Sequence, residues 1–272
     1  MGNMGKMKRE KHFVINKIQN TLEGYRRFDY DYVPYIGTWN IPDKNFVYRQ
    51  KGLDRVCTGV IRTVMRLLGP VLLFAAYGAR VDGRKNLKAL GKSGAICVCN
   101  HFNYLDTLMV RQAMGHYRSY HTMTPQNNKG GAGGWIVRHG GMLPFSPDLE
   151  AMRNLNVEIG RLLNEGKIVN FYAEQALWTN YQKPRPMKDG AFHYAVKHHV
   201  PVVPVFCTFK KDKRGHMHKL RIHILPVVYQ DESLPKKEKL EAMKAQAEEA
   251  WRECYEKAYG KPLAYLPDRR KK

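Results

Sequence analysis

Apolar and polar positions alternate in blocks along residues 83–259, and this pattern predicts an α/β fold. Short apolar runs, typical of buried strands, occupy 95–99, 119–124, 142–145, 168–173, 200–209 and 220–229. Apolar residues at helical spacing occupy 106–115, 148–164, 190–197 and 236–259. Because strands alternate with helices, we expect a mixed central sheet flanked by helices.

The most apolar segment, residues 56–79, precedes the first predicted strand. Its uninterrupted part, 67–79, is 13 residues long, and Arg62 and Arg66 lie just upstream. A helix that spans a bilayer needs about 20 apolar residues. The segment is therefore interpreted as a membrane-associated helix embedded in one leaflet, with its arginines reaching for headgroups. A buried core helix is the alternative interpretation.

Four regions are expected along the chain. A basic and aromatic extension at 1–50, with no secretory signal, precedes the membrane-associated helix at 51–80. The α/β domain follows at 81–230, and a charged helix with a basic tail occupies 231–272.

The chain is strongly basic. It has 46 Lys and Arg against 24 Asp and Glu, a formal net charge of +22 in 272 residues. Such a field favours an anionic membrane, an acidic protein or nucleic acid. Specific nucleic-acid binding is not expected, since no zinc finger, RNP strand or helix-turn-helix pattern is recognisable.

Cysteine usage indicates a reducing compartment. The five cysteines are odd in number and lack paired spacing. Cys97 and Cys99 would share one face of a strand, which favours core packing over metal binding. We expect neither a metal site nor a bound cofactor.

Candidate chemistry follows the strand at 95–99, where His101 and Asp106 are five residues apart. On a continuous helix this spacing would point the side chains away from each other. If His101 ends a loop and Asp106 begins a helix, the chain can fold them together. A neutral imidazole held by a carboxylate can take a proton from a hydroxyl, so the pair predicts a general base and its orienting partner.

Two further segments carry candidate binding groups. Glu174 follows the apolar strand at 168–173, and Lys183, Arg185 and Lys188 precede a predicted helix, where cations could bind phosphate. A simple strand-end residue and a solvated basic loop are the alternatives. The glycine-rich segment 130–134 is expected to be a loop; it lacks the Rossmann and P-loop spacing.

In this order the segments resemble a known family. The sequence places Asn-His-x4-Asp at 100–106, a glycine-containing segment at 141–145, Glu174 at a strand end and Val-Pro-Val-Val-Pro-Val at 200–205. Lys188-Asp189-Gly190-Ala191-Phe192 resembles a further family stretch, Lys-x-Gly-Ala-Phe. The series is similar to the PlsC-like family of 1-acyl-glycerol-3-phosphate (lysophospholipid) acyltransferases, over about residues 83–229.

The resemblance implies an enzyme of phospholipid biosynthesis on the cytoplasmic face of the cell membrane, peripheral or monotopic. It would move a fatty acyl group from an acyl carrier protein or coenzyme A thioester to a lysophospholipid hydroxyl. His101 would be the base, Asp106 would fix its tautomer, and Glu174 would help bind the glycerol part of the acceptor.

Two family arginines are replaced, by Ser146 and Leu177. Either nearby cations bind the acceptor phosphate instead, or the acceptor differs from lysophosphatidic acid. The candidate cations are Arg138, Lys183, Arg185 and Lys188. A relative with another lipid acceptor, a hydrolase, and a lipid- or nucleic-acid-binding protein without transfer activity stay open as alternatives.

Overall fold

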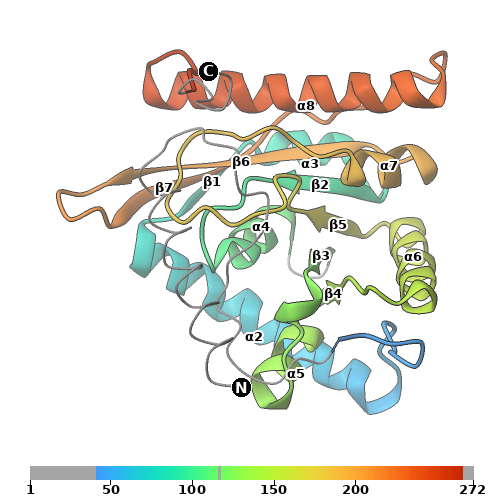
Figure 1. The fold of residues 1–272 in the computed structure, drawn as a ribbon. Helices are drawn as coiled ribbons and strands as arrows, with labels where there is room; N and C mark the ends of the chain where they lie inside the picture. The colour runs from blue at the N-terminus through green and yellow to red at the C-terminus, as the bar shows by residue number, and fades with distance from the viewer. Residues whose placement is uncertain (1–40, 116–117, 266–272) are drawn as a thin grey trace, which may run out of the picture.

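A seven-stranded sheet forms the centre of the computed structural model, which describes residues 41–115 and 118–265 (Figure 1). The strand order is β1-β7-β6-β2-β5-β3-β4, and β6 and β7 are antiparallel while the other neighbours are parallel. The strands are β1 (Arg80–Asp82), β2 (Ala95–Cys99), β3 (Ser119–Met123), β4 (Met142–Pro144), β5 (Ile168–Phe171), β6 (Val202–Lys211) and β7 (Met217–Ile224). The predicted mixed sheet is confirmed.

Helices cover both faces of this sheet. They are α2 (Gly52–Tyr77), α3 (Arg84–Leu90), α4 (Asp106–Met114), α5 (Gly131–His139), α6 (Leu149–Asn164), α7 (Gly190–Lys197) and α8 (Lys236–Tyr259), with a 3-10 turn η1 at Pro125–Asn127. Side chains of α6, α7 and α8 form one core cluster, and those of α2, α3 and α4 form another on the opposite face. Every residue of β2 is buried, as expected for a central parallel strand with helices on both sides.

Helix α2 has two different faces. Arg62, Gly69 and Leu73 are buried on the face that packs against α4, α5 and β7. The helices approach closely at Gly69, where a Cβ would lie 2.9 Å from a Leu108 methyl carbon. The other face exposes large apolar side chains: Leu53, Val56, Val60, Val64, Leu67, Leu68, Val71, Leu72 and Phe74. Among the described residues, α2 alone is long and apolar enough to cross a membrane, judged by length and composition only.

The sequence prediction was wrong or incomplete at several places. Strand β5 ends at Phe171 rather than 173, and β6 occupies Val202–Lys211 rather than 200–209. The glycine-rich segment, expected as a loop, begins helix α5 at Gly131, because tertiary packing overrides the weak helix propensity of glycine. The short elements β1 and α3 were not predicted. Strand β7 begins at Met217 rather than 220, and after Ile224 only a single bridge, between Val202 and Val228, continues the pairing.

Residues 1–40 of the predicted basic and aromatic extension and residues 266–272 of the predicted basic tail lie outside the described residues.

Candidate active site

The structure brings His101 and Asp106 together at the carboxyl end of β2. Asp106 is the first residue of α4, and the chain between turns on Asn103, whose Oδ1 accepts the Leu105 N–H at 2.8 Å. This turn leaves His101 Nδ1 2.5 Å from Asp106 Oδ2. The Asp106 side chain is 2% exposed and that of His101 13%. The loop-then-helix geometry therefore places a buried carboxylate on one nitrogen of a partly accessible imidazole.

Asn100 fixes the point where this loop leaves the sheet. Its Oδ1 accepts the Cys207 N–H at 2.8 Å, and its Nδ2 donates to the Cys207 carbonyl at 3.2 Å. Because Cys207 belongs to β6, the residue before His101 is tied to the neighbouring strand. The backbone entering the loop is thus rigidly attached to the core.

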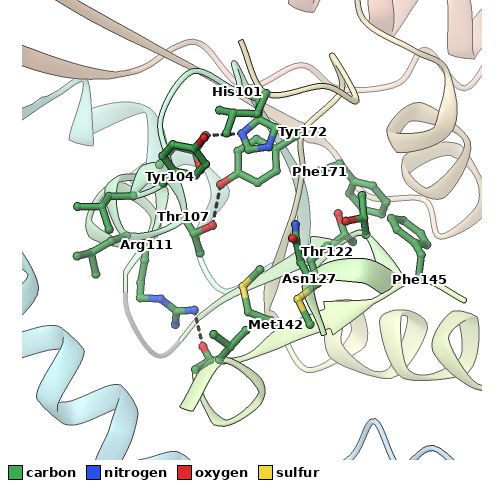
Figure 2. Close-up of a pocket in the computed structure, with 18 of the residues that line it drawn as sticks. His101, Tyr104, Thr107, Arg111, Thr122, Asn127, Met142, Phe145, Phe171 and Tyr172 are labelled. Atoms are coloured by element: carbon green, nitrogen blue, oxygen red, sulfur yellow. Dashed lines mark hydrogen bonds and ion pairs between the residues drawn. The ribbon is translucent and has the colours of Figure 1, made fainter. Parts of the chain in front are cut away.

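Tyr172 supports the imidazole from one side, a contact that the sequence analysis missed. The His101 and Tyr172 rings stack with centroids 4.0 Å apart and an interplanar angle of 20°. The Tyr172 hydroxyl lies 3.0 Å from Thr107 Oγ1, and Figure 2 shows the three side chains together beside the pocket. Burial, reinforced by the Asp106 charge, raises the pKa of Tyr172, which keeps this hydroxyl neutral. The alternation of Asn170, Tyr172 and Glu174 is the one sequence signal that could have indicated it.

His101 lies in the wall of a large cavity. The cavity has a volume of about 1150 Å³, and it extends from His101 between α2, α4 and α5. Apolar side chains make up most of its lining, among them Met65, Leu68, Leu108, Met142 and Phe145. The size is at the upper end for a small-ligand site, and the lining suits a long apolar ligand.

Glu174 does not point into open space. Its Oε2 accepts the His101 N–H at 3.0 Å and Arg185 Nη2 at 2.7 Å, while its Oε1 accepts the Arg185 N–H at 2.8 Å. The side chains of Glu174 and Arg185 are 2% and 8% exposed. Two predicted substrate-binding residues therefore form a buried ion pair against the backbone of the predicted base.

The other predicted cations differ in position. Lys188 lines the cavity. Lys183 Nζ donates to the Ala264 carbonyl at 2.7 Å, and Arg138 Nη1 donates to Asn128 Oδ1 at 3.1 Å and the Lys129 carbonyl at 2.9 Å. Lys129, which the sequence analysis did not single out, also lines the cavity.

The positions that lack the family arginines have other neighbours. Ser146 Oγ donates to the Pro42 carbonyl at 2.5 Å and accepts the Asp148 N–H at 2.9 Å. Leu177 is buried in the cavity wall. Gln175, directly after Glu174, has a φ of 62°, in the left-handed region that favours glycine. Its side chain lines the cavity, so a residue with a strained backbone lies at the site.

Two buried arginines tie α2 to the start of β3 and α4 to the residues before β4, so the prediction that Arg62 reaches for lipid headgroups is wrong. Arg62 Nη2 donates to the Ser119 carbonyl at 2.9 Å, and Arg111 donates to the Gly140 carbonyl. Burial, together with the neighbouring Arg62 charge, lowers the pKa of Arg111. A Cβ at Gly141 would lie 2.5 Å from Arg62 Nη1, so glycine makes room for this guanidinium.

Within residues 41–115 and 118–265, no group of three or more His, Cys, Asp or Glu side chains is placed to hold a metal ion. Cys97 and Cys99 are both buried in the core cluster under α4, on one face of β2 as predicted. Burial raises the pKa of both thiols.

Comparison with known proteins adds three findings. A family model described as acyltransferase matches residues 78–230. Among solved structures, the crystal structure of the 1-acyl-sn-glycerophosphate (LPA) acyltransferase PlsC from Thermotoga maritima is similar, with 18% sequence identity and a TM-score of 0.49 over 72% of this chain and 80% of that one. No curated protein sequence matches.

Proposed function

The chain belongs to the acyltransferase family, and from this premise we propose that it transfers a fatty acyl group from an acyl thioester to a hydroxyl of a lysophospholipid. The acceptor proposed first is 1-acyl-glycerol-3-phosphate. Acyl carrier protein and coenzyme A are the two proposed carriers of the acyl group.

One observation carries the proposal: the 2.5 Å contact between His101 and Asp106 lies in the wall of an apolar cavity of about 1150 Å³. A hydrolase dyad needs access for water, whereas acyl transfer to a lipid needs room for long chains beside the base. The apolar lining favours the second requirement.

Asp106 accepts a hydrogen bond from His101 Nδ1, which leaves the neutral imidazole in the tautomer whose Nε2 is basic. Nε2 removes the proton of the acceptor hydroxyl while that oxygen bonds to the thioester carbonyl carbon. When the tetrahedral intermediate collapses, the carbon–sulfur bond breaks and the imidazolium returns the proton to the leaving sulfur. No acyl-enzyme forms.

Lys188 is the cation that we propose for the acceptor phosphate. It lines the cavity and begins the stretch that resembles Lys-x-Gly-Ala-Phe. Its position supports this role, whereas Lys183 donates to the Ala264 carbonyl and Arg138 donates to Asn128 Oδ1. A charge-assisted hydrogen bond to phosphate is stronger than a neutral one.

We further propose that α2 lies in the cytoplasmic leaflet of the membrane. Arg62, Gly69 and Leu73 pack one face of the helix against the domain, which supports a position along the membrane surface. Its exposed apolar face suits an interfacial position. Four exposed cations in the β6–β7 hairpin, Lys210, Lys211, Lys213 and Arg214, would add attraction to anionic headgroups. The hairpin projects past the end of α2 (Figure 1).

An assay with purified full-length protein tests the function. Acyl carrier protein and coenzyme A thioesters are offered with a panel of lysophospholipids, and products are identified by mass spectrometry. The expected product is a diacyl phospholipid, formed by the wild type and lost in His101→Ala. Free fatty acid as the only product would indicate a thioesterase, and transfer by His101→Ala at the wild-type rate would contradict the proposed base.

A further inference from the structure

Both oxygens of the Glu174 carboxylate are bonded to groups of the protein. Oε2 accepts the His101 N–H at 3.0 Å, Arg185 Nη2 at 2.7 Å and Arg185 Nε at 3.2 Å, and Oε1 accepts the Arg185 N–H at 2.8 Å. Three donors saturate the lone pairs of Oε2, and the whole side chain is 2% exposed. An acceptor hydroxyl therefore has little access to this carboxylate.

Arg185 is held as firmly as Glu174. It lies between Pro184 and Pro186, whose rings fix their own backbone angles. Its guanidinium donates to the Ala176 carbonyl and lies 4.4 Å above the Trp178 ring. A planar guanidinium clamped on a carboxylate, a carbonyl and an aromatic face has a fixed orientation.

The segment 174–185 binds both backbone polar groups of His101. The His101 N–H donates to Glu174, and its carbonyl accepts the Trp178 N–H at 3.0 Å and Arg185 Nη2 at 3.5 Å. Asp106 and Tyr172 contact the ring. The direction of the imidazole therefore depends on two separate sets of contacts, one on the ring and one on the backbone.

We propose that Glu174 and Arg185 are positioning residues, which fix the backbone of His101 and do not contact the acceptor. Arg185 supplies the guanidinium partner of Glu174 in a chain where Leu177 stands at the family's arginine. The inference rests on the proposed function, in which His101 is the base.

Removing one partner would leave the other charge buried and uncompensated, and it would loosen the His101 backbone. Displacement of a catalytic group by about 1 Å can cost about 100-fold in rate. We therefore expect Arg185→Met and Glu174→Gln to lower kcat by about 10- to 100-fold, with the KM for the acceptor changed less than about threefold. Arg185→Lys should keep part of the activity.

The double variant Glu174→Gln/Arg185→Met removes both charges. Because it leaves neither charge uncompensated, its loss should be smaller than the product of the two single losses. Arg161→Met is the matched control, since Arg161 forms an ion pair with Glu158 on α6 at 2.6 Å. It should change neither kcat nor KM.

A second readout does not depend on turnover. The nuclear magnetic resonance signal of the His101 ring, labelled with ¹³C at Cε1, is assigned by its loss in His101→Ala. Arg185→Met and Glu174→Gln should change its chemical shift and titration midpoint, and Arg161→Met should change neither. If the wild type transfers no acyl group, the proposed function fails, while this signal still decides whether the pair positions His101.

Two outcomes would overturn the inference. One is an unchanged His101 signal together with an unchanged kcat in both single variants. The other is a Glu174→Gln variant that keeps the wild-type kcat and raises the KM for the acceptor, which would make Glu174 a substrate contact.

Discussion

The Asp106 carboxylate lies 2.5 Å from Nδ1 of His101. On a continuous helix these two side chains would point apart, and the turn between them brings them together. Asp106→Asn preserves the size of the side chain but can hold the imidazole in the wrong tautomer. It should lower kcat by about 10²- to 10⁴-fold in the acyl-transfer assay. The double variant with His101→Ala should lose little more than His101→Ala alone, because the two residues act as a unit. Additive losses would show that they act separately.

Lys188 and Lys183 form a matched pair for testing acceptor binding. Lys188→Ala removes a cation from the cavity wall and should raise the KM for 1-acyl-glycerol-3-phosphate by about tenfold or more. Lys183→Ala removes a cation whose Nζ donates to the Ala264 carbonyl, and it should leave this KM unchanged. With an uncharged monoacylglycerol acceptor, neither variant should differ from the wild type. Equal effects of Lys188→Ala on both acceptors would argue against a phosphate contact.

Gln175 has a backbone conformation that costs a non-glycine residue roughly 1–2 kcal/mol, since its φ is 62°. Gln175→Gly should therefore leave thermal stability equal or slightly higher, after the entropy cost of glycine of roughly 0.5–1 kcal/mol. Gln175→Val should lower the melting temperature, because a β-branched residue tolerates this conformation poorly. Calorimetry on the three proteins makes the comparison. A melting temperature that falls equally in both variants would remove backbone strain as the explanation.

Membrane binding should depend on the outer face of α2. Leu67 and Val71 are 64% and 66% exposed and lie one turn apart. Leu67→Asp/Val71→Asp should lower the affinity for phospholipid vesicles at least about tenfold, because both side chains lose their burial in the acyl region. Val157→Asp is the control, since Val157 is 73% exposed on α6. Sedimentation with vesicles gives the bound fraction, and equal binding by all three proteins would contradict the proposed position of α2.

Stability should fall at alkaline pH because of buried thiols. Burial raises the pKa of Cys254 to about 12, and it raises those of Cys97 and Cys99 as well. An acid whose pKa is raised by folding stabilises the protein fully below its unfolded pKa, and this contribution is lost as the pH rises above that value. For thiols the loss begins near pH 9 and has a limit of about 1.4 kcal/mol per pH unit for each group. Urea denaturation between about pH 8 and 10 measures it, and Cys254→Ala should reduce the slope.

The sequence predicted the elements that have strong periodicity. Helices α6, α7 and α8 and strand β2 were placed within a residue, because each has one clear apolar pattern or a continuous apolar run. Helix α5 was not predicted because its first turn is Gly131-Ala132-Gly133-Gly134. Packing against α2 and β4 makes this segment helical. The short β1 depends on pairing with β7, more than a hundred residues away, which no local pattern can indicate.

At the site too, local sequence predicted some contacts, and others depend on tertiary packing. His101 and Asp106 are close in sequence, so a loop followed by a helix was enough to predict their contact. Glu174 and Arg185 were both singled out, but as binders of substrate. Their contact requires the loop between them to fold back over Trp178, and that path depends on tertiary packing. Tyr172 was missed although it alternates with Asn170 and Glu174, and Lys129 was missed because nothing in its local sequence distinguishes it from a surface residue.

Helix α2 has apolar side chains on the solvent-exposed face and contributes Met65, Leu68 and Leu72 to the cavity wall. Leu68 and Leu72 also belong to the exposed face, so if that face lies among lipid tails the cavity opens toward the bilayer along α2. A lipid would then pass between bilayer and cavity without entering water. Each methylene that stays out of water on this route avoids about 0.8 kcal/mol. The solubility of the lipid in water would then matter little to the rate of substrate entry.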